Sequence, residues 1–420
     1  MNPHGADLAA LVRETMVALT LILAAAKIGG ELFSRMGQPP VLGELVFGVI
    51  LGNLDLVGVT ALGGLEHNVA IAAVAEIGVV LLLFEVGLES DLHELLAVGR
   101  SALLVATLGV AAPMVLGYGV SAVMLPAAGW MTHLFVGATL TATSVGITAR
   151  VFKDLNAADT KEARIILGAA VADDVIGLVV LAVVSGLVMA AAGGQAAFSA
   201  AGALWIIGKA ALFLGVAVLA GRFLAQRMFH YAARLRVPGV LLAVCISFCF
   251  VVAALAGLVG LAPIVGAFAA GVVLDPVHYR PFLERGERRV EELLFPITTL
   301  IVPVFFVLMG LRVDLKSFAS AEVLGFAALV TAAAIAGKQV CGLGVLEKGV
   351  DRITVGVGMI PRGEVGLIFA GMGAALVAGG KPIFSPATFS AMVFMVMLTT
   401  FLTPPLLKIV LGRGRKAPVL

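Results

Sequence analysis

Long, nearly uninterrupted apolar runs recur along the whole chain and constrain its fold more than any other feature. Most of these runs approach or exceed the roughly 20 residues that an α-helix needs to cross a bilayer. Hydrophobic residues make up 61% of the sequence and charged residues only 13%, about half the charged share of soluble domains. This excludes a water-soluble globule, and the runs lack the short alternating pattern of a membrane β-barrel. We expect an all-α polytopic membrane protein. Its net charge of +2 gives no indication of nucleic acid binding.

Thirteen membrane segments are predicted, and two of them, which begin next to prolines, are short. Loops after odd-numbered segments carry most of the Lys and Arg residues. Since cytoplasmic loops hold the excess of these residues, we expect a plasma (inner) membrane protein with its N-terminus outside and its C-terminus in the cytoplasm. The segments lie near residues 14–34, 40–54, 69–88, 99–125, 130–152, 162–190, 201–225, 237–257, 260–274, 289–311, 320–346, 351–378 and 384–411.

Two pairs of similar motifs share one spacing along the chain. PVLGELVFGVIL starts at Pro40 and PIVGAFAAGVVL at Pro263, while GLESDL starts at Gly87 and GLRVDL at Gly310; each pair is separated by 223 positions. This distance spans seven segments, so the two copies would point in opposite directions. Inverted repeats of this kind are typical of secondary transporters. We predict a single membrane domain over residues 1–420. Its parts would be a first repeat, a linker helix and a second repeat, at 14–190, 201–225 and 237–411.

Two adjacent acids, Asp173 and Asp174, lie near the middle of the apolar segment 162–190. Charge at membrane depth is costly, and it usually marks a functional site. Neighbouring helical residues point about 100° apart, so one carboxylate can line a cavity while the other pairs with a cation. The candidate cations are Lys27, Lys209, Lys338 and Arg362. We favour Lys338 as the partner of Asp173, because it lies deep within segment 320–346.

Two segments contain sequences that interrupt a helix. TLTATSVGIT at 139–148 is rich in hydroxyl side chains, and GMIPRGEVGL at 358–367 contains Pro361, which removes a helical hydrogen bond. Unwound backbone at membrane depth is tolerated where it lines a cavity, and matching breaks in two repeats indicate a transport site. Two structural explanations remain open, namely helix packing by small residues at 139–148, and an Arg362 pair with Glu364 or Glu44.

Other acidic residues lie in apolar surroundings at Glu44, Glu76 and Glu85. We expect them to be protonated or paired with Arg362 or Lys27, and Glu76 is the first candidate for a direct role. The sequence contains no His/Cys cluster with metal-ligand spacing, no phosphate-binding glycine loop and no Ser/His/Asp grouping. We therefore expect no cofactor, no use of ATP and no enzymatic activity.

Four motifs together make a specific combination, and they extend over nearly the whole chain. They are ADDVIGL around Asp173–Asp174, TATS at 141–144, the lysine at 338, and PRGE at 361–364. In these motifs the chain resembles bacterial sodium/proton antiporters of the cation:proton antiporter-2 superfamily, the NapA-like type. The resemblance implies a homodimer, and a core domain with two crossed discontinuous helices interleaved with a dimerisation domain.

The same resemblance implies a distribution of roles among the buried polar residues. Asp174 would be the ion-binding carboxylate, and Asp173 would be the partner of Lys338. Sodium would bind to these acids with help from hydroxyl and carbonyl oxygens, which small hard cations prefer. The further ion ligands would be Thr143 and Ser144, and the supporting residues would be Thr141, Arg362, Glu364, Glu76 and Glu85.

The paired acids and the lysine predict electrogenic exchange of Na⁺ or Li⁺ for H⁺ by alternating access, with proton and sodium competing for Asp174. The Asp173–Lys338 pair would break when the ion binds. Four alternatives are a K⁺/H⁺ antiporter, a sodium-coupled symporter of an organic anion, an intramembrane aspartyl protease and a passive cation channel. Adjacent acids on one helix argue against the protease, which needs its two acids on different helices.

Overall fold

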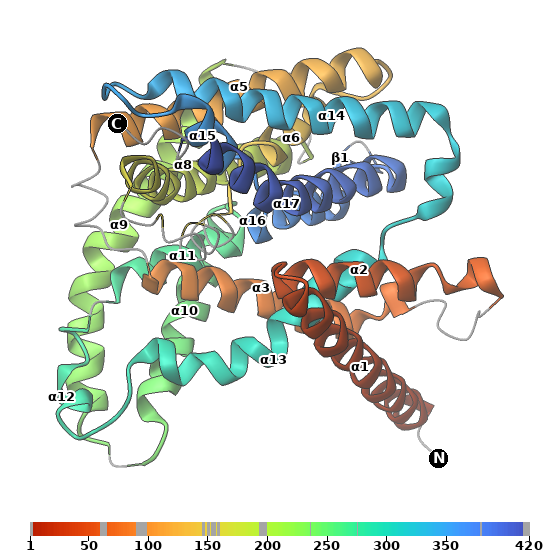
Figure 1. Cartoon of the computed structure of the whole chain (residues 1–420). Coiled ribbons are helices and arrows are strands. Elements are labelled where there is room, and N and C mark those ends of the chain that lie inside the picture. Colours follow the sequence, from red (N-terminus) through yellow and green to blue (C-terminus); the bar gives the residue numbers. More distant parts are fainter. Residues whose placement is uncertain are drawn as a thin grey trace. The chain divides into compact units, whose positions relative to one another are not determined.

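The structure is a computed structural model in which helices predominate (Figure 1). It describes residues 3–58, 65–89, 99–144, 148, 152, 157, 160–192, 200–235, 237–274, 276–378 and 380–414. The elements are α1 (Pro3–Arg35), α2 (Pro40–Gly52), α3 (Val69–Glu89), α5 (Arg100–Met124), α6 (Trp130–Thr139), α8 (Lys161–Ala192), α9 (Ala200–Ala232), α10 (Val240–Leu258), α11 (Pro263–Val273), α12 (Arg280–Leu283), α13 (Val290–Leu311), α14 (Ala321–Val340), α15 (Arg352–Gly358), α16 (Glu364–Ala375), β1 (Val377–Ala378), β2 (Lys381–Pro382) and α17 (Pro386–Gly414). Short 3₁₀ helices lie at Leu54–Val57, Leu65–His67, Leu315–Ala319 and Cys341–Gly344.

Within the described residues, eight helices are long and apolar enough to cross a membrane, and three shorter apolar helices accompany them. The short ones include α2 and α11, which both begin at a proline. Proline is well placed at the first helical position, where its missing N–H is not needed. The chain is therefore a helical, multi-pass membrane protein.

The chain divides into two compact units, and each unit is built from two separate stretches of sequence. Unit 1 comprises Met1–Ser90 and Lys209–Asp314, and unit 2 comprises Asp91–Gly208 and Leu315–Leu420. Unit 1 thus holds α1–α3, most of α9 and α10–α13. Unit 2 holds α5, α6, α8, α14–α17 and the two strands.

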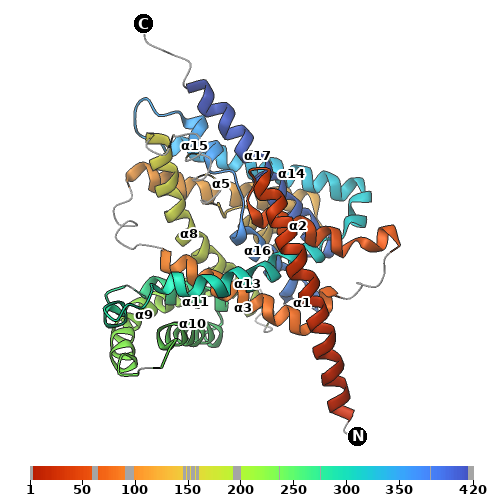
Figure 2. The ribbon, with the colours of Figure 1, turned by 60° about the horizontal axis from the view of Figure 1, so that its bottom comes forward.

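Glycines let the helices of unit 1 cross at very short distances. In α2, which packs against α1 and α13 (Figure 2), a Cβ added at Gly48 would overlap the Val307 carbonyl. In α11, which packs against α3, a Cβ added at Gly271 would overlap the Phe84 carbonyl. Gly48 and Gly271 are separated by the same 223 positions as Phe84 and Val307, so one crossing geometry occurs twice in this unit.

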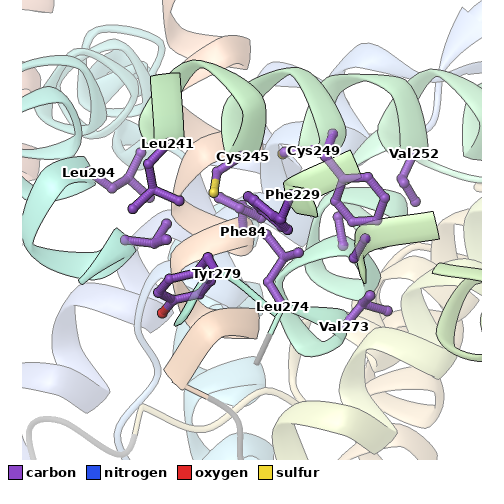
Figure 3. Packing of buried hydrophobic residues seen from close by; sticks show 14 of the residues in the cluster. Phe84, Phe229, Leu241, Cys245, Cys249, Val252, Val273, Leu274, Tyr279 and Leu294 are labelled. Carbon is purple, nitrogen blue, oxygen red and sulfur yellow. The ribbon is translucent and has the colours of Figure 1, made fainter. Parts of the chain in front are cut away.

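The apolar core of unit 1 brings together α3, α9, α10, α11, α12 and the first turns of α13 (Figure 3). Phe229 packs against Tyr279 with ring centroids 5.9 Å apart. Cys245 and Cys249 are buried in this cluster as free thiols. Such contacts hold these helices together through close van der Waals packing.

Unit 2 contains one small departure from the predicted helices. The apolar segment expected to continue to residue 378 ends as a helix at Ala375, and an antiparallel pair of two-residue strands follows. Gly380 lies in this hairpin with a φ of 78°, a value that favours glycine in a tight turn. The hydropathy of Val377 and Ala378 concealed this turn in the sequence.

Candidate functional site

Two interrupted helices contact each other within unit 2. Helix α15 ends at Gly358 and α16 begins at Glu364. Helix α6 ends at Thr139, Leu140–Ser144 are not helical, and Thr148 is helical again. The Ser144 N–H donates to the Pro361 carbonyl at 2.8 Å, and the Thr148 hydroxyl donates to the Gly358 carbonyl at 2.6 Å. Two main-chain carbonyls at the break between α15 and α16 thus receive hydrogen bonds from the other interrupted segment, one from an N–H and one from a hydroxyl.

A buried ion pair lies beside these breaks. Lys338 in α14 places its Nζ 3.4 Å from both carboxylate oxygens of Asp173 in α8. The same Nζ donates a hydrogen bond of 2.7 Å to the Thr141 carbonyl. The side chains of the pair are 0% and 1% exposed. Three elements thus meet at one ammonium group, and a buried pair of this kind needs such additional acceptors to offset the loss of hydration.

Asp174 follows Asp173 in α8, but its side chain lies outside the described part of the chain, as does that of Glu364 at the start of α16. The ion-binding role of Asp174 and the acid partner of Arg362 therefore stay predictions.

Arg362 lies within the break between α15 and α16 and is completely buried. Its guanidinium donates to the carbonyls of Met359 at 3.3 Å, Ile360 at 3.1 Å and Ala334 at 3.1 Å. The Thr400 hydroxyl in α17 donates to the Arg362 carbonyl. Arg362 thereby attaches the break between α15 and α16 to α14 at Ala334. Ala334 lies about one helical turn before Lys338.

The hydroxyl-rich stretch after α6 supplies oxygen atoms next to the second break. The buried Thr143 hydroxyl has no hydrogen-bond partner among the described residues. A Cβ added at Gly363 would lie 2.6 Å from the Ser144 Oγ, so Ser144 sits directly against the other broken segment. The Thr141 hydroxyl donates to the Ala138 carbonyl at 2.8 Å. Carboxylate, hydroxyl and carbonyl oxygens are suited to a small hard cation.

The remaining predicted acids, Glu44, Glu76 and Glu85, belong to unit 1, whereas the residues of the ion pair belong to unit 2. Glu44 is buried in α2 and interacts electrostatically with Lys27, whose Nζ donates to the Thr299 carbonyl at 2.9 Å. Glu76 is exposed on α3, and Glu85 is half-buried on the same helix. Their supporting roles stay predictions.

The structure adds neighbours of Lys338 that carried no signal in the sequence. The Cys341 thiol donates to the Lys338 carbonyl at 2.7 Å. Gly109 in α5 faces the lysine ammonium, and Gly337 packs against Pro113. The contacts made by Gly109 and Pro113 join residues far apart in sequence, and the Cys341 contact uses a main-chain carbonyl, so no side-chain pattern could have identified them.

Comparison with known proteins identifies the family. The family described as "Sodium/hydrogen exchanger, transmembrane" matches residues 18–412. The high-affinity Na⁺/H⁺ antiporter NhaS3 of Synechocystis sp. is 39% identical, over 96% of this chain and 90% of its own length. The Na⁺/H⁺-K⁺ antiporter GerN of Bacillus cereus is 33% identical, over 96% of this chain and 98% of its own length.

A solved structure shows the same fold. The sodium proton antiporter MjNhaP1 of Methanocaldococcus jannaschii aligns with a TM-score of 0.70 over 96% of this chain and 97% of its own, at 15% identity. The resemblance predicted from the four motifs is confirmed by the family match and by the relatives. The chain belongs to the sodium/hydrogen exchanger family of membrane transporters.

Proposed function

We propose that the chain is a secondary active antiporter that extrudes Na⁺ or Li⁺ in exchange for H⁺. The observation that carries this proposal is the buried Asp173–Lys338 pair, which lies where two interrupted helices meet in a member of this family. An ion pair at membrane depth is expensive and is retained mainly for function. The names of both relatives describe Na⁺/H⁺ antiport, and this supports Na⁺ as the cargo here.

In the proposed mechanism, Asp174 binds either a proton or a sodium ion. Protonation on the outer side and proton release to the cytoplasm leave a carboxylate that takes up cytoplasmic sodium. Oxygen atoms of Asp173, Thr143 and Ser144 complete the ion site, and the Asp173–Lys338 pair breaks as the ion enters. Release of a second proton by Lys338 gives two protons per sodium, so that exchange moves net charge.

The architecture that we propose consists of thirteen spans arranged as two inverted six-segment repeats. The glycine crossings of α2 and α11 support this arrangement, because they recur at the 223-residue spacing of the sequence motifs. Unit 2, which contains the ion pair, would be the core domain, and unit 1 would form the dimerisation domain of a homodimer. Movement of the core domain would give alternating access. We place the N-terminus outside and the C-terminus in the cytoplasm of the plasma membrane.

Potassium is the second cargo to test, because the name of the relative GerN includes K⁺ as well as Na⁺. Hydroxyl and carboxylate oxygens can bind either cation, and the size of the site decides between them. A symporter of an organic anion has no support from the named relatives.

The decisive variant is Asp174→Asn in purified protein reconstituted in sealed vesicles with an imposed pH gradient and a pH-sensitive dye. We expect added Na⁺ or Li⁺ to dissipate the gradient with wild type and to have no effect with Asp174→Asn, because an amide cannot exchange a proton for a cation. An imposed membrane potential should change the wild-type rate, since net charge moves.

A matched control is Glu31→Gln, which also replaces an acid by an amide but at an exposed surface pair with Arg35. Its exchange should equal that of wild type. Exchange by Asp174→Asn at the wild-type rate would refute the site. A response to K⁺ alone would assign potassium as the cargo instead of sodium.

A further inference from the structure

The Lys338 ammonium faces a gap in the side-chain packing of α5. Gly109 is buried in this helix, and a Cβ added there would lie 3.4 Å from the Lys338 Nζ and 3.6 Å from the Cys341 Cβ. The absence of a side chain at Gly109 therefore brings the main chain of α5 next to the ammonium. No other residue type would leave this backbone equally accessible.

One turn further along α5, Pro113 changes the hydrogen bonding of Gly109. In a regular α-helix the carbonyl of residue 109 would accept from the N–H of residue 113. Pro113 lies inside the helix and has no N–H, so this donor is missing. The Gly109 carbonyl consequently retains the capacity to accept a hydrogen bond from elsewhere.

The same two residues form the face of α5 that packs against α14. A Cβ added at Gly337 would lie 2.8 Å from the Pro113 Cα, and Gly337 is the neighbour of Lys338. Positions four apart share one helix face, so Gly109 and Pro113 both point toward α14. The Gly109 carbonyl, which lacks its regular donor at position 113, and the Lys338 ammonium thus belong to facing surfaces of two packed helices.

We propose that the Gly109 carbonyl is a second hydrogen-bond acceptor for Lys338, used when an entering cation displaces the lysine from Asp173. This inference rests on the proposed function. A lysine nitrogen that leaves Asp173 in a dry environment must keep its N–H groups bonded, and this holds whether it is charged or has released its proton. Gly109 and Pro113 are then positioning residues that stabilise the cation-bound state through Lys338.

Two substitutions remove this acceptor in different ways. Gly109→Ala places a methyl group at an ordinary contact distance from Nζ and covers the backbone. Pro113→Ala leaves the space open but restores the N–H that engages the Gly109 carbonyl. The matched control is Gly119→Ala in the same helix, at an exposed position where an added Cβ meets no atom within 4 Å.

The experiment measures the Na⁺ dependence of exchange in vesicles for wild type and the three variants. In Gly109→Ala and Pro113→Ala we expect the apparent KM for Na⁺ to rise about tenfold with a similar maximal rate, because a hydrogen bond from a charged donor is worth about this factor. Gly119→Ala should match wild type. The melting temperature without Na⁺ should change little, whereas the added stabilisation by Na⁺ should shrink.

Dependence on the lysine provides a second test. In a Lys338→Gln background, Gly109→Ala should have no further effect on stabilisation by Na⁺, because the interaction being removed is already absent. Values of KM for Gly109→Ala and Pro113→Ala within about twofold of Gly119→Ala would overturn the inference while leaving the antiporter proposal intact. Absence of Na⁺-driven exchange in wild type and Gly119→Ala alike would overturn the proposed function and this inference with it.

Discussion

A buried ammonium such as that of Lys338 is tolerated only where several acceptors surround it, because an unpaired charge in a dry interior is very costly. Here the acceptors are the Asp173 carboxylate and the Thr141 carbonyl. The 3.4 Å contacts to the carboxylate are longer than those of a strong charge-assisted bond. This geometry agrees with the proposal that the pair opens when a cation enters the site.

Replacing Asp173 or Lys338 alone should lower the stability of the protein more than replacing both residues together. We expect Asp173→Asn and Lys338→Gln each to cost about 3–5 kcal/mol, because each leaves one buried charge uncompensated. The double variant should be more stable than either single one. Thermal melting of purified protein in detergent at neutral pH measures this difference.

The control for this comparison is Arg280→Gln, which breaks an exposed pair with Glu284. An exposed pair contributes about 1 kcal/mol or less, so this variant should melt close to wild type. A double variant whose destabilisation equals the sum of the two single effects would contradict a direct interaction between Asp173 and Lys338.

Close helix crossings are the features of this fold that depend most on individual glycines. In unit 1, Gly48 and Gly271 each allow a helix to lie directly on a neighbouring carbonyl. Side-chain burial cannot produce such approaches, because any Cβ would have to displace backbone. The repeat of this geometry at the spacing of the sequence motifs suggests that both crossings contribute similarly to stability.

Gly48→Ala and Gly271→Ala should therefore each destabilise the protein by about 1–3 kcal/mol, the usual cost of overpacking. Gly215→Ala in α9 is the control, since an added Cβ at this exposed position meets no atom within 4 Å. Thermal melting of the three variants tests this. A loss of stability in only one of the two crossing variants would contradict their equivalence.

Much of the element pattern could be predicted from the sequence. Hydropathy marks the long helices, and Pro361 together with the hydroxyl-rich stretch marks the two breaks, because these residues disturb helical hydrogen bonds. Hydropathy does not reveal the hairpin at β1–β2, since Val377 and Ala378 are as apolar as the helix before them, and only the Gly-Gly pair at 379–380 signals a turn there. The carbonyl groups that accept hydrogen bonds from Arg362 could not be predicted. Every residue has a main-chain carbonyl, so the sequence does not show which of them lie near the guanidinium.

In the molecule as a whole, the Asp173–Lys338 pair and the Thr141 carbonyl that accepts from Lys338 all belong to unit 2. This unit is assembled from two separate stretches of chain. The proposed alternating-access mechanism needs a core domain that keeps its site intact as it moves, and a site contained in one unit is compatible with that proposal. The sequence predicted residues for this site by their depth in apolar segments. It could not predict how the chain divides into units, because that depends on packing between distant helices.

In the proposed mechanism, sodium and protons compete for one buried carboxylate site. The most direct test is the apparent KM for Na⁺, measured in vesicles as a function of pH with wild type. Competition predicts that KM rises as the pH falls, by about tenfold per pH unit for each proton displaced, at an unchanged maximal rate. A KM that stays constant with pH while the maximal rate falls would contradict the claim, because protons would then act at a different site.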